Sequence, residues 1–101
     1  MRNWKYTLVG QTPVLESDVI KWAEWFETAD RVVAQTEIGA TLVSTVFLGL
    51  DHQLGDGPPV LFETALFTDG EPEGARRRCA TWDQAEAQHR QVVAEIRVRR
   101  I

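Results

Sequence analysis

The residue types that could perform acid–base or metal chemistry gather around one loop of this sequence. Asp51 and His52 precede a stretch rich in glycine and proline, Asp56 lies within it and Glu63 follows it. A histidine beside carboxylates can act as a general base or can share a metal ion with them. Aspartate, glycine and proline are also the ordinary residues of a hairpin loop, so loop formation explains most of the same cluster without catalysis.

The familiar catalytic and cofactor signatures are missing from the sequence. It has no phosphate-binding glycine motif, no HExxH, no GxSxG and no paired CxxC. One cysteine, Cys79, and two histidines predict neither a disulfide framework nor a structural zinc site. His89 lies on an apolar helical stripe, which favours a core histidine over a ligand. We therefore expect a protein that is not an enzyme and that needs no cofactor or metal.

The three consecutive arginines Arg76, Arg77 and Arg78 form the one tight basic run. Strand alternation would send Arg76 and Arg78 to one side and Arg77 to the other. Such a pair could bind a phosphate or a carboxylate in bidentate fashion. With an aromatic ring such as Trp25 or Tyr6 stacked on a base, the run would suit a small anionic nucleotide. A solvated sheet edge is the alternative interpretation.

Length and charge set limits on the function. The chain has 101 residues, the size of one domain, and a net charge of −4. An acidic total argues against non-specific binding to a nucleic-acid backbone, although the last quarter of the chain is basic. No apolar segment resembles a signal peptide or is long enough to cross a bilayer, so we expect a cytoplasmic protein.

Hydrophobic periodicity and turn residues predict a single α+β domain over residues 1–101. A capping box formed by Thr81 and Gln84 opens the last helix, and Ser17 is the expected N-cap of the first. Residues 31–38 are compatible with helix or strand, and the β-branched pair in this segment favours a strand. The expected elements are strand 4–9, helix 19–29, strands 31–38, 41–50 and 60–67, edge strand 76–80, and helix 82–97. This β-α-β-β-β-β-α order suggests an antiparallel four- to five-stranded sheet with two helices on one face.

The central hairpin is predicted to be apolar on both of its faces, whereas two helices on one side would cover only one. The side assigned to the core holds Leu42, Val46, Leu48, Leu50, Val60, Phe62 and Leu66. The other side holds Val43, Thr45, Phe47, Leu61, Glu63 and Phe67. Either the chain's own segments cover this second side, or a partner or a second copy does.

Three strings of the sequence resemble a known protein family. They are STVFLGLDH at 44–52, GDGPPVLFET at 55–64 and ATWDQAEAQH at 80–89. They resemble short uncharacterised proteins from tailed bacteriophages and prophages. The resemblance implies a phage or prophage origin and action inside a bacterial cell. Small phage proteins of this sort often bind a host protein, including defence machinery, so the resemblance also implies a possible inhibitor of host defence.

The sequence thus leads to one leading hypothesis and two alternatives. The first is a non-enzymatic protein that binds a host bacterial protein, itself as a homodimer, or both. The alternatives are a binder of a small anionic nucleotide, and a small hydrolase or nuclease that uses Asp51, His52, Asp56 and Glu63. A minor virion component also remains open. The expected binding residues are Val43, Phe47, Leu61, Phe67, Trp25, Arg76, Arg77 and Arg78.

Overall fold

Tight turns fold the chain into antiparallel hairpins, as the glycine positions require. The computed structural model describes residues 3–99. Gly39 adopts a φ of 61° in the two-residue turn between β3 (Val32–Ile38) and β4 (Thr41–Phe47). Asp69 and Gly70 adopt φ values of 52° and 81° between β5 (Phe62–Thr68) and β6 (Glu71–Cys79). These left-handed conformations favour glycine and aspartate and match the twist of paired strands.

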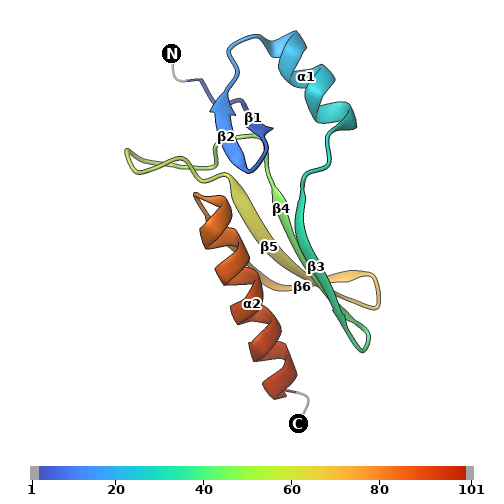
Figure 1. Ribbon diagram of the computed structural model, residues 1–101. Coiled ribbons are helices and arrows are strands. Elements are labelled where there is room, and N and C mark those ends of the chain that lie inside the picture. The colour runs from blue at the N-terminus through green and yellow to red at the C-terminus, as the bar shows by residue number, and fades with distance from the viewer. Residues whose placement is uncertain (1–2, 100–101) are drawn as a thin grey trace.

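The four strands form one antiparallel sheet in the order β3-β4-β5-β6, and helix α2 (Trp82–Arg99) covers one of its faces (Figure 1). The predicted capping box starts α2: the Thr81 hydroxyl accepts the Gln84 amide at 3.1 Å, and the Gln84 side chain accepts the Thr81 amide at 3.2 Å. The helix buries the predicted stripe Ala85, His89, Val92, Val93 and Ile96. Sheet and helix together therefore build the main core.

The N-terminal third forms a separate layer beyond one end of this sheet (Figure 1). A small hairpin joins β1 (Tyr6–Val9) to β2 (Thr12–Leu15), and helix α1 (Val19–Thr28) packs against β1. The Trp22 indole donates hydrogen bonds to the carbonyls of Tyr6 and Gly49, both at 3.1 Å. Gly49 has a φ of 78°, and a Cβ there would lie 2.9 Å from the Phe26 ring, so only glycine fits this contact.

The predicted α+β class and the antiparallel four-stranded sheet are confirmed. Residues 31–38 were the ambiguous segment, and they contain strand β3. The N-terminal segment contains a strand that is absent from the expected elements, because residues around Pro13 pair with β1 as β2. Helix α1 begins at Asp18, whose carboxylate accepts the amides of Ile20 and Lys21, and not at Ser17.

The two helices meet the sheet in different ways. Helix α2 lies across β3 to β6, whereas α1 packs against β1 and reaches the core on the α2 side through Trp25, which meets the Phe47 ring. The strand β4 ends at Phe47 and the chain turns at Gly49, so α1 lies against the turn and the small hairpin. The radius of gyration is 14.7 Å, whereas a typical domain of this length has about 13 Å. None of the helices in residues 3–99 has the length and apolarity that crossing a membrane requires.

Candidate functional site

The face of the sheet opposite α2 is the most distinctive surface of the molecule. Strand register places twelve side chains on it, and we call this set the open face. Within residues 3–99 no helix packs against it. Its members are Val32, Gln35 and Glu37 of β3, Leu42, Ser44 and Val46 of β4, Glu63, Ala65 and Phe67 of β5, and Pro72, Arg76 and Arg78 of β6.

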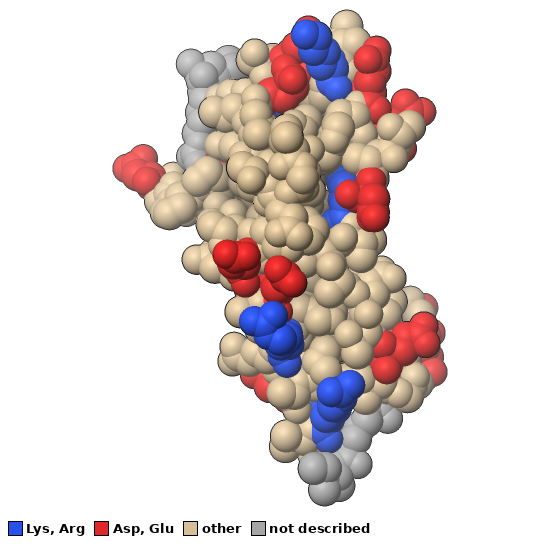
Figure 2. Space-filling model, viewed as in Figure 1, with Lys and Arg blue, Asp and Glu red and all other residues tan. Residues whose placement is uncertain are grey.

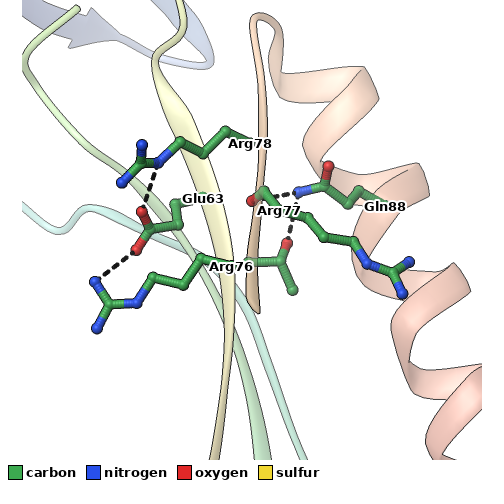
Figure 3. Close-up of polar contacts among 6 residues, drawn as sticks. Glu63, Arg76, Arg77, Arg78 and Gln88 are labelled. Atoms are coloured by element: carbon green, nitrogen blue, oxygen red, sulfur yellow. Dashed lines mark hydrogen bonds and ion pairs between the residues drawn. The ribbon is translucent and has the colours of Figure 1, made fainter. Parts of the chain in front are cut away.

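A carboxylate held between two arginines occupies the β5–β6 side of the open face. Arg78 Nε donates to Glu63 Oε2 at 2.9 Å, and Arg76 Nη1 lies 3.5 Å from Glu63 Oε1 (Figure 3). The Glu63 side chain is only 9% exposed, whereas Arg76 and Arg78 are 51% and 43% exposed. Arg76, Arg78 and Glu63 together carry one net positive charge, and the two exposed guanidinium groups lie beside the nearly buried carboxylate.

Arg77 lies on the other side of the same strand, as the alternation predicts. Its guanidinium pairs with Glu95 of α2, with Nη1 3.2 Å from Oε1 (Figure 3 shows Arg77 on the helix side). This hydrogen bond lowers the pKa of the Glu95 carboxyl. The Gln88 amide donates to the Arg77 carbonyl at 3.0 Å. The three arginines therefore do not converge on one ligand, and each already has a carboxylate neighbour.

The rest of the open face is apolar at both ends and small in the middle. Leu42 and Phe67 are cross-strand partners at the end near the hairpin turns, and Val32 and Val46 are partners at the other end. Between them lie Ser44 and Ala65, which are also partners. Gln35 donates its amide to the Ser44 hydroxyl at 3.2 Å. A shallow, mixed surface of this kind suits contact with another protein better than enclosure of a small molecule.

The expected phase of β4 is wrong, and this changes which residues can form the surface. Val43 and Phe47 are completely buried beneath α2, and Leu61 is 2% exposed in the same core. Only Phe67, among the four apolar residues expected at the surface, lies on the open face. Trp25 is half-buried and meets the Phe47 ring edge-on at 5.9 Å between centroids. The apolar surface residues that sequence reasoning missed are Leu42 and Val46.

A buried polar chain explains why β4 takes this phase. His89 Nδ1 and Nε2 each lie 2.8 Å from a threonine hydroxyl, of Thr45 and Thr36 respectively. Thr45 and Thr64 hydroxyls lie 2.7 Å apart, and the Gln88 amide donates to Thr64 at 3.0 Å. Every hydroxyl is satisfied when Thr64 donates to Thr45, Thr45 donates to Nδ1, and the Nε2 proton goes to Thr36. His89 is thus a core histidine, and both of its ring nitrogens are bonded to threonine hydroxyls.

The loop residues with catalytic potential have separate structural surroundings. Asp51 is buried, and its Oδ1 accepts the amides of Gln53 and Val60 at 2.8 and 2.9 Å. His52 and Asp56 are exposed, and Glu63 is engaged by the arginines of the open face. Within residues 3–99 no three histidine, cysteine, aspartate or glutamate side chains form a group that could hold a metal ion. Asp51 therefore organises the loop.

Charge on the α2 side of the molecule is mixed. Figure 2 shows acidic and basic side chains interspersed on that face, with no continuous basic strip. A phosphate backbone is bound by clustered positive charge, so this face is unsuited to that role.

Comparisons with protein-family models, with curated proteins and with solved structures found no match to this chain. The function is therefore inferred from the residues of the open face.

Proposed function

We propose that this chain is a non-enzymatic binding protein that uses the open face to contact another protein inside a bacterial cell. The observation that carries the proposal is the unequal covering of one sheet: α2 shields one side, and no helix of residues 3–99 shields the other. The bacterial setting comes from the resemblance of the sequence to phage and prophage proteins, and inhibition of host defence machinery is one role that this setting would allow.

The chemistry of the open face supports a protein partner. Leu42, Val46, Val32 and Phe67 supply apolar contacts at its two ends, and arginine is among the residues enriched at protein interfaces. The Glu63 carboxylate is already paired with Arg76 and Arg78, so covering it would not bury an unpaired charge. A partner would need an apolar surface of matching size and an acidic group near the arginines.

The test compares two variants in affinity capture from a susceptible bacterial lysate. Phe67→Asp places a charge on the open face, and Val98→Asp places the same charge on the exposed outer side of α2. We expect wild type and Val98→Asp to retain the same host protein and Phe67→Asp to lose it. Thermal unfolding of both variants checks that the fold persists.

Two results would contradict the proposal. One is equal retention of the host protein by a folded Phe67→Asp variant and by wild type. The other is loss of the host protein from Val98→Asp alone, which would place the contact surface on α2.

A further inference from the structure

We infer that the hollow between α2 and β3 binds a small phosphate monoester, whose phosphoryl group is held by Arg90, Arg97 and the Thr36 hydroxyl. This hollow lies on the side of the sheet that α2 covers, so it is separate from the open face and adds a second activity to the proposed function. Two features support the assignment: a pair of arginines without carboxylate partners, and a hydroxyl donor that the buried polar chain leaves unused.

The hollow opens along the side of α2 that faces β3. It has a volume of about 390 Å³, which is within the range of sites that hold small molecules. Its lining residues are Thr36 of β3 and His89, Arg90, Val93, Ala94 and Arg97 of α2. The carboxylates of the neighbouring helix turns, Glu86 and Glu95, lie outside this lining. The hollow is therefore lined by two positive charges and by no negative charge of the described residues.

The two arginines of the hollow have no partners of opposite charge. Arg90 and Arg97 are exposed, and neither forms an ion pair with another described residue. By contrast, Arg99 on the β6 side of the same helix lies 3.8 Å from Glu73. Arg90 and Arg97 are two helical turns apart, so their Cα atoms stand about 10 Å apart on one side of α2. The small Ala94 lies between them and leaves room for a group that both guanidinium groups can reach.

The direction of the buried polar chain leaves one hydrogen-bond donor unused at the hollow. Thr64 is 2% exposed, so its hydroxyl proton needs an acceptor inside the protein, and the Thr45 hydroxyl provides it at 2.7 Å. Thr45 then donates to His89 Nδ1, and Nε2 donates its proton to Thr36 Oγ1. The Thr36 hydroxyl proton remains, and Thr36 is the half-buried end of the chain that lines the hollow. A ligand oxygen in the hollow can accept this proton.

A phosphate monoester fits these three donors better than a carboxylate does. Its phosphoryl group carries about two negative charges at neutral pH and three strong acceptor oxygens. The charges match Arg90 and Arg97, and the oxygens match two guanidinium groups and one hydroxyl. A carboxylate has one charge and two oxygens, so it leaves a donor unmatched. Figure 2 shows mixed charge over this side of the molecule, which favours a small ligand over a polymer with many phosphates.

An NMR titration tests the assignment, with phenyl phosphate as the probe and benzoate as its singly charged control. At low salt, phenyl phosphate should shift the backbone amides of Thr36 and Ala94 and the ring nitrogens of His89. Benzoate should bind at least about tenfold more weakly, because it carries one charge fewer. Inorganic phosphate should shift the same signals, which separates recognition of the phosphoryl group from recognition of the phenyl ring.

Matched arginine variants distinguish this site from a general attraction of anions to arginine. Arg90→Gln and Arg97→Gln should each weaken phenyl phosphate binding by at least about tenfold, because each removes a charge-assisted hydrogen bond. Arg99→Gln removes the same charge from the other side of α2 and should leave the affinity within about twofold of wild type. All three side chains are exposed, so each variant should remain folded.

Variants of Thr36 test the hydroxyl donor. Thr36→Ser keeps the hydroxyl and should keep the affinity, whereas Thr36→Val removes the donor and should weaken binding. Circular dichroism confirms the fold of both variants, and the arginine variants decide the question if Thr36→Val does not fold.

An absence of shifts with phenyl phosphate at tens of millimolar would overturn the inference. So would equal losses of affinity in Arg90→Gln, Arg97→Gln and Arg99→Gln, since they would show only a general attraction of anions. Equal binding of benzoate and phenyl phosphate would overturn the choice of a phosphate ligand. None of these results bears on capture of a host protein through the open face, so the two proposals fail separately.

Discussion

The two faces of the four-stranded sheet differ less in hydrophobicity than in the polar groups that they bury. Beneath α2, Val43 and Phe47 are fully buried, and Thr45 between them is satisfied by His89 and Thr64. On the open face, Val46 is the cross-strand partner of Glu63, whose carboxylate is satisfied by arginines reaching into water. The two faces therefore differ in what satisfies the buried polar group. On the covered face it is a side chain of helix α2, and on the open face it is a pair of arginines exposed to solvent.

The largest expected effect is a difference in stability loss between a phenylalanine of the covered face and a phenylalanine of the open face. Phe47→Ala removes a fully buried ring that meets Phe62 at 5.3 Å between centroids, so the free energy of unfolding should fall by about 3–5 kcal/mol. Phe67→Ala on the open face should cost about 1 kcal/mol. Urea unfolding of both variants measures the difference. Equal losses would mean that the open face is packed as tightly as the core.

The next effect is a difference in stability loss between two neighbouring arginines that lie on opposite faces of the sheet. Arg78→Ala removes the closest partner of the nearly buried Glu63 carboxylate and should cost about 1–2 kcal/mol. Arg77→Ala removes an exposed pair with Glu95 and should cost less, because water screens that contact. Chemical denaturation in low salt gives both values. A larger loss for Arg77→Ala would contradict the assignment of the buried carboxylate to the open face.

The smallest expected effect is a pH dependence of the stability, and it arises from the covered face alone. Burial lowers the pKa of His89, so the unfolded chain takes up the proton more readily than the folded one. Its neighbours across the sheet are threonine hydroxyls, and the charged residues beside it on the α2–β3 side are Arg90 and Arg97. No carboxylate in residues 3–99 is bonded to its ring. Stability should therefore be complete above about pH 6.5 and should decline as the pH falls below that value.

Urea midpoints measured from about pH 7.5 to about pH 5 check this dependence. His89→Gln should flatten the profile, and His52→Gln, in the exposed loop, serves as the matched control. A wild-type profile that does not change over this range would show that the His89 site tolerates the charged imidazole.

Sequence reasoning could predict the elements of the fold because their signals are local. The capping box at Thr81, the α2 stripe and the arginine alternation depend on neighbouring residues, and each matches the structure. The phase of β4 could not be read in this way, because apolar residues occupy both of its sides. Counting through Leu48 and Leu50, which lie beyond the strand end at Phe47, favoured the wrong side.

The arrangement of the candidate site was equally hidden from the sequence. Thr36, Thr45 and Thr64 come from three strands, and only tertiary register brings them to His89. Glu63 and Arg78 face each other through the pairing of β5 with β6, which a loop-based catalytic hypothesis for Glu63 did not consider. Local patterns therefore located the residues, and strand register decided which of them meet.

Methyl-resolved NMR with an inert soluble paramagnetic probe tests the central claim most directly, since it compares the two faces in one sample. In dilute protein the probe should broaden the methyl signals of Leu42 and Val46 and spare those of Val43 and Val92. With a bound partner, Leu42 and Val46 should become protected while Val43 and Val92 do not change. If Leu42 and Val46 are as protected as Val43 in the dilute monomer, or remain exposed under every condition, the open face is not an interaction surface.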